Sequence, residues 1–112
     1  MKRVGIVEGY YGKISTFEQR KKIISSLSEH GLNFYMYAPK EDPFLRLNID
    51  IDHTENWLRE FDDFIAHAQN MSVEVGIGLA PIYKNKTEAL KSKIQNFSDR
   101  GVKFFSILFD DI

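Results

Sequence analysis

Two adjacent aspartates, Asp110 and Asp111, are the residues of this chain best suited to catalysis. They directly follow an apolar run, residues 104–109 with the sequence FFSILF. Two neighbouring carboxylates repel each other when both are ionised, and a half-buried setting raises the pKa of at least one of them. Separated pKa values allow one carboxyl group to act as an acid while the other stays charged. The alternative is that both are solvated loop residues or a helix N-cap, and spacing alone leaves the two interpretations about equal.

A glycine pair and a lysine are the next candidates, and both are suited to binding. Gly9 and Gly12 enclose Tyr10 and Tyr11, a pattern that fits a tight turn where backbone approaches a ligand beside an aromatic wall. Lys40 follows a predicted strand and could hydrogen-bond a ligand hydroxyl. Taken alone, each feature has a commoner structural explanation: a simple turn with packed tyrosines, and a surface lysine.

Several classes of chemistry are excluded by what the chain lacks. There is no cysteine, and three scattered histidines, His30, His53 and His67, favour neither a metal site nor a Ser-His-Asp triad. No GxGxxG or Walker pattern is present, so we expect no metal and no cofactor. Fifteen basic residues balance sixteen acidic ones, which argues against a nucleic-acid or anionic-membrane partner. No apolar run reaches the ~20 residues of a membrane span. Without a signal-peptide pattern the chain leans to the cytoplasm, although its location is not fixed.

Strand-like and helix-like patterns alternate along the whole chain. The start of the first helix is marked by a capping box, either Thr16 with Gln19 or Ser15 with Glu18. The middle helix has the clearest apolar stripe, from Trp57 to Ala68 at helical spacing. The patterns predict strands over 3–8, 33–38, 73–78 and 102–109, and helices over 16–30, 54–70 and 87–100.

Alternating strands and helices predict an α/β fold with a parallel sheet, for which two architectures are open. One is a small doubly wound sheet, and the other is the first half of a (β/α)8 barrel. A buried parallel strand needs cover on both faces, yet the strand predicted over 102–109 is followed by no helix. Complete barrels of this kind have about 250 residues. The half barrel over residues 1–112 is therefore favoured, with the candidate residues gathered at the C-terminal ends of its strands.

Five blocks of the sequence, taken together, resemble glycoside hydrolase family 84. This family contains the O-GlcNAcases and the bacterial β-N-acetylglucosaminidases often labelled hyaluronidases. The blocks occur in the order and spacing of the family and extend over nearly the whole chain. They are VEGYYG at 7–12, TFEQR at 16–20, GLN at 31–33, YMYAPKED at 35–42 and LFDDI at 108–112.

The resemblance implies a retaining β-N-acetylglucosaminidase in which the substrate's own 2-acetamido oxygen is the nucleophile, by way of an oxazoline. Asp110 resembles the carboxylate that orients the acetamido N–H. Asp111 resembles the general acid that then serves as the base. Gly9, Tyr10 and Lys40 resemble residues that contact the sugar. The implied partner is a glycan or glycoprotein that carries N-acetylglucosamine.

The sequence departs from the family pattern at two loops, and it leaves other readings open. GKIS at 12–15 replaces the usual Gly-Arg-Pro-Trp, and API at 80–82 replaces Ser-Pro-Gly. The family's remaining sugar-binding residues lie on later strands, so we expect these 112 residues alone to be inactive. The alternative function is a carbohydrate-binding or self-associating half barrel without turnover, in which an unclosed sheet pairs two copies as a homodimer. An O-GlcNAc protein, a mucin glycan and a hyaluronan-like polymer all remain open as substrates.

Overall fold

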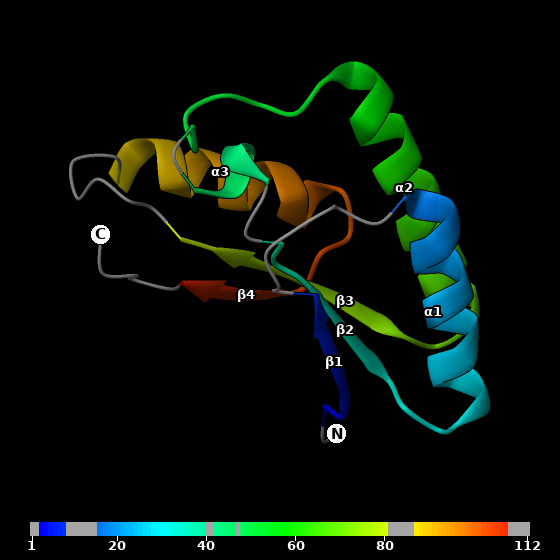
Figure 1. The fold of residues 1–112 in the computed structure, drawn as a ribbon. Helices are drawn as coiled ribbons and strands as arrows, with labels where there is room; N and C mark the ends of the chain where they lie inside the picture. Colours follow the sequence, from blue (N-terminus) through cyan, green and yellow to red (C-terminus); the bar gives the residue numbers. More distant parts are fainter. Residues whose placement is uncertain (1–2, 9–15, 40–41, 47, 81–86, 108–112) are drawn as a thin grey trace.

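A computed structural model describes residues 3–8, 16–39, 42–46, 48–80 and 87–107, and shows one parallel sheet covered by helices (Figure 1). The strands are β1 (Gly5–Glu8), β2 (Phe34–Tyr37), β3 (Glu74–Leu79) and β4 (Phe104–Ile107). The helices are α1 (Phe17–Glu29), α2 (Glu55–Asn70) and α3 (Thr87–Asp99), with a short 3-10 helix, η1 (Pro43–Leu45), in the segment expected to be a plain loop. No helix among these residues is long and apolar enough to cross a bilayer.

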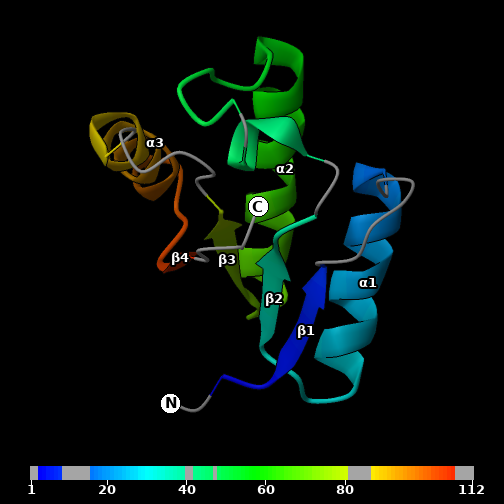
Figure 2. The ribbon, with the colours of Figure 1, turned by 60° about the vertical axis from the view of Figure 1, so that its left-hand side comes forward.

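The order of the strands and the position of the helices decide between the two predicted architectures. All neighbours are parallel, and their order in space is β1-β2-β3-β4, the order in the sequence. Residues from α1, α2 and α3 pack into one apolar cluster on a single face of the sheet, an arrangement that Figure 2 shows with the strands in front. A doubly wound sheet has helices on both faces. The fold is therefore the α/β arrangement of a half barrel.

Local signals explain where the helices begin. The side chain of Thr16 accepts a hydrogen bond from the Gln19 amide at 3.1 Å, and the Gln19 side chain accepts one from the Thr16 amide at 2.8 Å. Of the two capping boxes that the sequence allows, the structure thus uses Thr16 with Gln19. Thr54 caps α2 in the simpler way, by accepting from the amide of Trp57 at 3.2 Å.

The three helices end in the same way, although the sequences at their ends are only loosely alike: HGL at 30–32, NMS at 70–72 and RGV at 100–102. Each has one residue with positive φ just after it: Gly31 at 72°, Ser72 at 58° and Gly101 at 106°. The next residue then bonds back over the turn, as when the amide of Val102 donates to the carbonyl of Phe97 at 3.1 Å. This is the Schellman pattern. It delays the start of β4 to Phe104, two residues after the predicted start.

The opposite face of the sheet carries a second, smaller apolar group. Phe34, Met36 and Ala38 of β2 and the segment after it are buried there, with Phe104 packed against them. Gly76 and Gly78 of β3 leave the space that these side chains fill, since a Cβ on Gly78 would lie 2.6 Å from that of Ala38. This face corresponds to the interior of a barrel, and the large helix-side cluster corresponds to its outer layer.

Candidate active site

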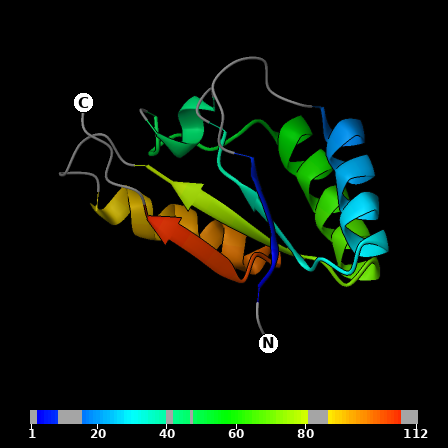
Figure 3. The same cartoon turned by 60° about the horizontal axis from the view of Figure 1, so that its bottom comes forward.

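The five predicted site residues, Gly9, Tyr10, Lys40, Asp110 and Asp111, lie outside the described residues. Their arrangement therefore stays a prediction. The structure does describe the ends of the strands that precede them. Figure 3 shows β3 and β4 running side by side to the same edge of the sheet.

The C-terminal ends of β1 and β2 are tied together next to two of these residues. Glu8, the last residue of β1, is paired in register with Tyr37, the last residue of β2. The amide of Ala38 donates to the carbonyl of Glu8 at 2.9 Å. Gly9 directly follows Glu8 and Lys40 comes three residues after Tyr37. The two positions predicted to contact the sugar thus follow, in the sequence, two strand ends that are joined to each other.

Glu8 is held by a buried ion pair with α1. The Arg20 guanidinium donates twice to its carboxylate, from Nε to Oε1 at 2.9 Å and from Nη2 to Oε2 at 3.1 Å. The hydroxyl of Tyr35 donates to the same Oε1. Both partners of the ion pair are almost fully buried. This geometry is bidentate, the strongest arrangement that an arginine and a carboxylate adopt.

The surroundings of Arg20 keep its charge in place. Its guanidinium carbon lies 4.7 Å from the ring centre of Phe17 and 4.8 Å from that of Tyr37, so that it contacts two aromatic rings. Burial alone would lower the pKa of Arg20, but the hydrogen bonds to Glu8 outweigh it, and the net shift of the pKa is upward. Burial also raises the pKa of the Tyr35 hydroxyl, with the bond to Glu8 adding to the effect. The tyrosine is therefore a neutral donor.

A second buried network lies just after β2 and is centred on Asp42. Its Oδ2 accepts from the hydroxyl of Tyr37 at 2.6 Å and from Nε2 of His53 at 2.8 Å. Its Oδ1 accepts from the amide of Phe44 at 3.0 Å, which caps η1. Burial would raise the pKa of Asp42, but the hydrogen bond and charge of His53 outweigh burial, and the pKa is lowered. Asp42, which comes two residues after Lys40 in the sequence, thereby fixes the start of η1.

His53 is held in this network by aromatic packing. Its ring stacks on that of Trp57, with the centroids 3.7 Å apart and the planes at 19°. Trp57 continues the stack to Phe61 at 5.0 Å. The orientation of the imidazole is therefore set by α2, which supplies both aromatic rings.

Lys93 of α3 completes the support of the segment after β2. Its ammonium donates to the carbonyl of Phe44 at 2.7 Å and to that of Ile51 at 2.6 Å. Burial lowers the pKa of this lysine. The segment is also joined to β3, because the amide of Ala80 donates to the carbonyl of Leu45 at 2.9 Å.

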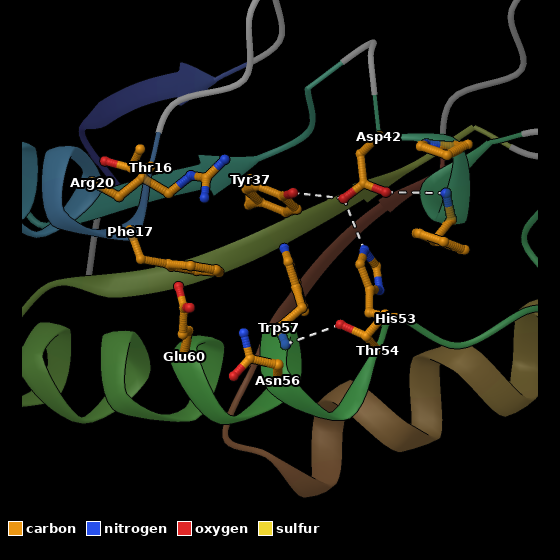
Figure 4. A pocket seen from close by; sticks show the side chains of 12 residues that line it. Thr16, Phe17, Arg20, Tyr37, Asp42, His53, Thr54, Asn56, Trp57 and Glu60 are labelled. Carbon is orange, nitrogen blue, oxygen red and sulfur yellow. Dashed lines mark hydrogen bonds and ion pairs between the residues drawn. The ribbon is translucent and has the colours of Figure 1, made fainter.

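A cavity of about 430 Å³ lies where these networks meet, on the helix side of the sheet (Figure 4). Its walls come from β2, η1 and the first turns of α1 and α2. They include Thr16, Phe17, Arg20, Tyr37, Asp42, Phe44, His53, Asn56, Trp57 and Glu60. Tyr37 lines it from the face opposite Met36 and Ala38, so this cavity lies between sheet and helices and not on the barrel's inner face. We infer that the polar side chains around this cavity hold the ends of β1 and β2 in place.

These supporting residues are not among the predicted site residues, although the sequence carries a signal for some of them. Arg20 stands between Phe17 and Ile24 at helical spacing, and Lys93 stands between Leu90 and Phe97 in the same manner. A charged residue within an apolar stripe indicates a buried partner. His53 gives no such signal, because its partner Asp42 and its stacking ring come together only in the fold. No cluster of metal-ligating side chains occurs within the described ranges.

Known proteins resemble this chain over nearly its whole length. The family model described as "beta-N-acetylglucosaminidase" matches residues 4–112. The Protein O-GlcNAcases of Rattus norvegicus and Mus musculus are each 34% identical over 118 residues, which cover 96% of this chain and 12% of theirs. A mutant of the Thermobaculum terrenum O-GlcNAc hydrolase superposes with a TM-score of 0.91 at 28% identity, covering 99% of this chain and 25% of that one.

The structural match and the family match support different conclusions about this chain. The superposition confirms the half-barrel architecture, and the family match confirms the resemblance on which the sequence interpretation rests. The chain spans only about one eighth of the length of the curated relatives it matches, 12% by the alignment. The match over residues 4–112 nevertheless includes both strand ends described above and all five predicted site residues. This chain belongs to the β-N-acetylglucosaminidase family.

Proposed function

We propose that this chain forms the first half of the catalytic domain of a retaining β-N-acetylglucosaminidase. The observation that carries the proposal is the family match over residues 4–112, which includes Asp110 and Asp111. The rigid strand ends support it, because a catalytic constellation needs side chains held on rigid elements. The buried pair of Glu8 and Arg20 supplies that rigidity beside Gly9.

In the first step of the proposed mechanism, the 2-acetamido oxygen of the sugar attacks its own C1. The bond between C1 and the leaving oxygen breaks, and Asp111 gives its proton to that oxygen. Asp110 stays ionised and accepts a hydrogen bond from the acetamido N–H. Its negative charge therefore stabilises the positive charge that develops on the oxazoline. The products of this step are the free aglycone alcohol and the bound oxazoline.

In the second step Asp111 acts as a base. It takes a proton from water, whose oxygen attacks C1 and opens the oxazoline, which restores the acetamido group. Two displacements at C1 give net retention of the β configuration. The adjacent carboxylates have different tasks in this scheme, since one must carry a proton near neutral pH and the other must not.

We further propose that the substrate is a protein carrying O-linked N-acetylglucosamine. The support is that the mammalian relatives are named Protein O-GlcNAcase and the bacterial structure is named an O-GlcNAc hydrolase. A mucin glycan and a hyaluronan-like polymer are the competing substrates. Release of N-acetylglucosamine from a glycosylated peptide, compared with release from hyaluronan fragments, distinguishes them.

The test of the activity uses 4-nitrophenyl N-acetyl-β-glucosaminide. Hydrolysis is measured with the 112-residue chain and with a form extended through eight strands, each with and without Asp111→Ala. We expect only the extended form to turn over, and Asp111→Ala to lower its rate by about 10²-fold or more. Asp63→Ala is the matched control, because Asp63 belongs to a second Asp-Asp pair of the sequence, Asp62-Asp63, and its side chain is 68% exposed on α2. An inert extended form, or an unchanged rate in Asp111→Ala, contradicts the proposal.

Self-association without turnover is the second candidate function, and the exposure of β1 favours it. Val4, Ile6 and Val7 are exposed apolar residues on or beside this strand, with Val7 at 63%. Among the described residues β1 pairs only with β2, so its outer edge is open to a second copy. Light scattering of the 112-residue chain tests this candidate. A dimer that Val7→Lys dissociates supports it, and a monomer at high concentration rules it out.

A further inference from the structure

A small enclosed cavity lies between the start of α2 and the end of α3. Its volume is about 10 Å³, and His53, Lys93 and Arg100 are among its lining residues, together with Asp52 and Asn96. Two buried side-chain nitrogens have no hydrogen-bond partner in the part of the chain that the structure describes, Nδ1 of His53 and Nε of Arg100. Both belong to residues that line this one cavity.

The chemistry of these two atoms specifies what fits between them. The Nε–H of an arginine can only donate, whereas an imidazole Nδ1 either accepts or donates according to its protonation. A buried polar atom left without a partner is costly, and a water molecule is the common remedy. A cavity of about 10–15 Å³ is the smallest that holds one water. The volume of the cavity and the hydrogen-bonding capacity of the two nitrogens therefore both fit one water molecule.

We propose that this cavity is a hydration site for one water molecule, which accepts from Arg100 Nε–H and bonds to His53 Nδ1. Resting on the proposed function, we extend the proposal to Arg100 as a positioning residue for the start of η1, which follows the predicted sugar-contacting Lys40 in the sequence. A cation is disfavoured because two basic residues, Arg100 and Lys93, are among the residues that line the cavity. Water serves His53 in either protonation state, because it both donates and accepts.

The water joins α3 to the network centred on Asp42. On one side Arg100 also donates from Nη1 to Asp62 of α2 at 2.6 Å. On the other side His53 donates from Nε2 to Asp42, whose second oxygen accepts from the amide of Phe44. A continuous chain of hydrogen bonds then runs from Arg100 to the start of η1. Arg100 acts on the start of η1 only through this chain.

The experiment uses the eight-stranded form and two variants that separate the water from the ion pair. Arg100→Lys keeps a positive charge near Asp62 but has no Nε–H for the water. Asp62→Asn removes the partner charge and leaves Nε in place. The first readout is a crystal structure at a resolution that shows water. The second is the NMR shift of the Phe44 amide, and the third is the split between KM and kcat on the chromogenic substrate.

We expect a water peak within hydrogen-bond distance of both nitrogens in the unaltered protein and in Asp62→Asn. Arg100→Lys should lose the peak, move the Phe44 amide resonance, and raise KM by about fivefold with little change in kcat. No peak between the two nitrogens in the unaltered protein overturns the hydration site. Equal changes in both variants overturn the positioning role, because they assign the effect to the ion pair with Asp62.

The crystallographic and NMR readouts do not depend on activity, so the two proposals fail separately. An eight-stranded form that hydrolyses nothing contradicts the proposed function. The hydration site is then still decided by the water peak, and its coupling to η1 is decided by the Phe44 amide.

Discussion

Nε of Arg20 lies 2.9 Å from Oε1 of Glu8, and the two side chains are only 2% and 4% exposed. This pair joins the last residue of β1 to the first turn of α1. Two buried charges are stable only when paired and hydrogen-bonded, and here both guanidinium bonds go to the same carboxylate. The position at which β1 ends, just before Gly9, is therefore fixed by a helix outside the sheet.

Removing one partner of this ion pair should be more harmful than removing both charges. Arg20→Met leaves Glu8 buried without its cation, and we expect the free energy of unfolding to fall by about 3–5 kcal/mol. Adding Glu8→Gln to Arg20→Met removes the stranded charge and should recover part of that loss. Urea unfolding of the unaltered chain, both single variants and the double variant measures the coupling between them. Additive losses in the double variant would show that the pair contributes nothing beyond its separate packing.

The lowered pKa of Asp42 predicts how stability depends on pH. Burial opposes ionisation of this carboxyl group, but hydrogen bonds from His53 and Tyr37 outweigh burial, and its folded pKa lies below that of the unfolded chain. Its contribution is fully present above the unfolded value of about 3.9 and is lost as the pH falls through the folded value. Asp42→Asn should therefore be less stable at pH 7 and show a flatter decline below about pH 4.

Urea midpoints between pH 2 and pH 7 check this prediction. Glu29→Gln is the control, because it neutralises an exposed carboxylate at the end of α1. Its profile should follow that of the unaltered chain. A profile of Asp42→Asn parallel to that of the unaltered chain would remove Asp42 as a source of the acid sensitivity.

Much of the fold could be predicted from the sequence because the deciding signals are local. The capping box at Thr16, the glycine at 31 and the apolar stripe of α2 are each formed by residues close in sequence. The half barrel followed from alternation and length, and the superposition confirmed it. The shift in the start of β4 could not be read in this way, because the turn around Gly101 uses residues that pattern alone assigns to the strand.

The supporting residues of the candidate site were harder to predict because they depend on contacts between distant segments. Glu8 and Tyr35 are 27 residues apart, and Lys93 lies 49 residues from Phe44. Asp62 and Asp63 lie near the polar face of α2, where the sequence pattern alone indicates solvated carboxylates. In the fold each is exposed but makes its own ion pair, with Arg100 and Lys21 respectively. No spacing rule identifies partners at such separations.

Lys93 should matter far more to stability than its neighbour on the same helix. Lys93→Met removes the charged donor of two part-buried hydrogen bonds, to the carbonyls of Phe44 and Ile51, at an expected cost of about 1–3 kcal/mol. Lys91→Met is the matched control, because the Lys91 side chain is 70% exposed and its ion pair is with the exposed Glu88. Thermal unfolding of both variants measures the difference. Equal changes in Tm would contradict a structural role for the two carbonyl bonds.

The close approach of β1 to β2 predicts a strong effect of adding a single methyl group at Gly5. A Cβ at this position would lie 1.6 Å from the backbone carbonyl oxygen of Phe34, so alanine cannot be accommodated without moving β1. Gly31→Ala is the matched control: its φ of 72° costs an alanine about 1–2 kcal/mol, yet no atom lies within 4 Å of the new Cβ.

Hydrogen exchange distinguishes these two kinds of cost. Gly31→Ala should lower stability across the whole chain and leave the relative protection of its amides unchanged. Gly5→Ala should selectively expose the amides that bond across the two strands, namely that of Asn33, which donates to Val4 at 2.8 Å, and that of Ala38, which donates to Glu8. Because Gly9 follows Glu8, the same variant of the eight-stranded form should also raise KM. If the amides of Asn33 and Ala38 stay protected in Gly5→Ala, β1 tolerates the shift, and the position of Glu8 does not depend on the close approach of the two strands at Gly5.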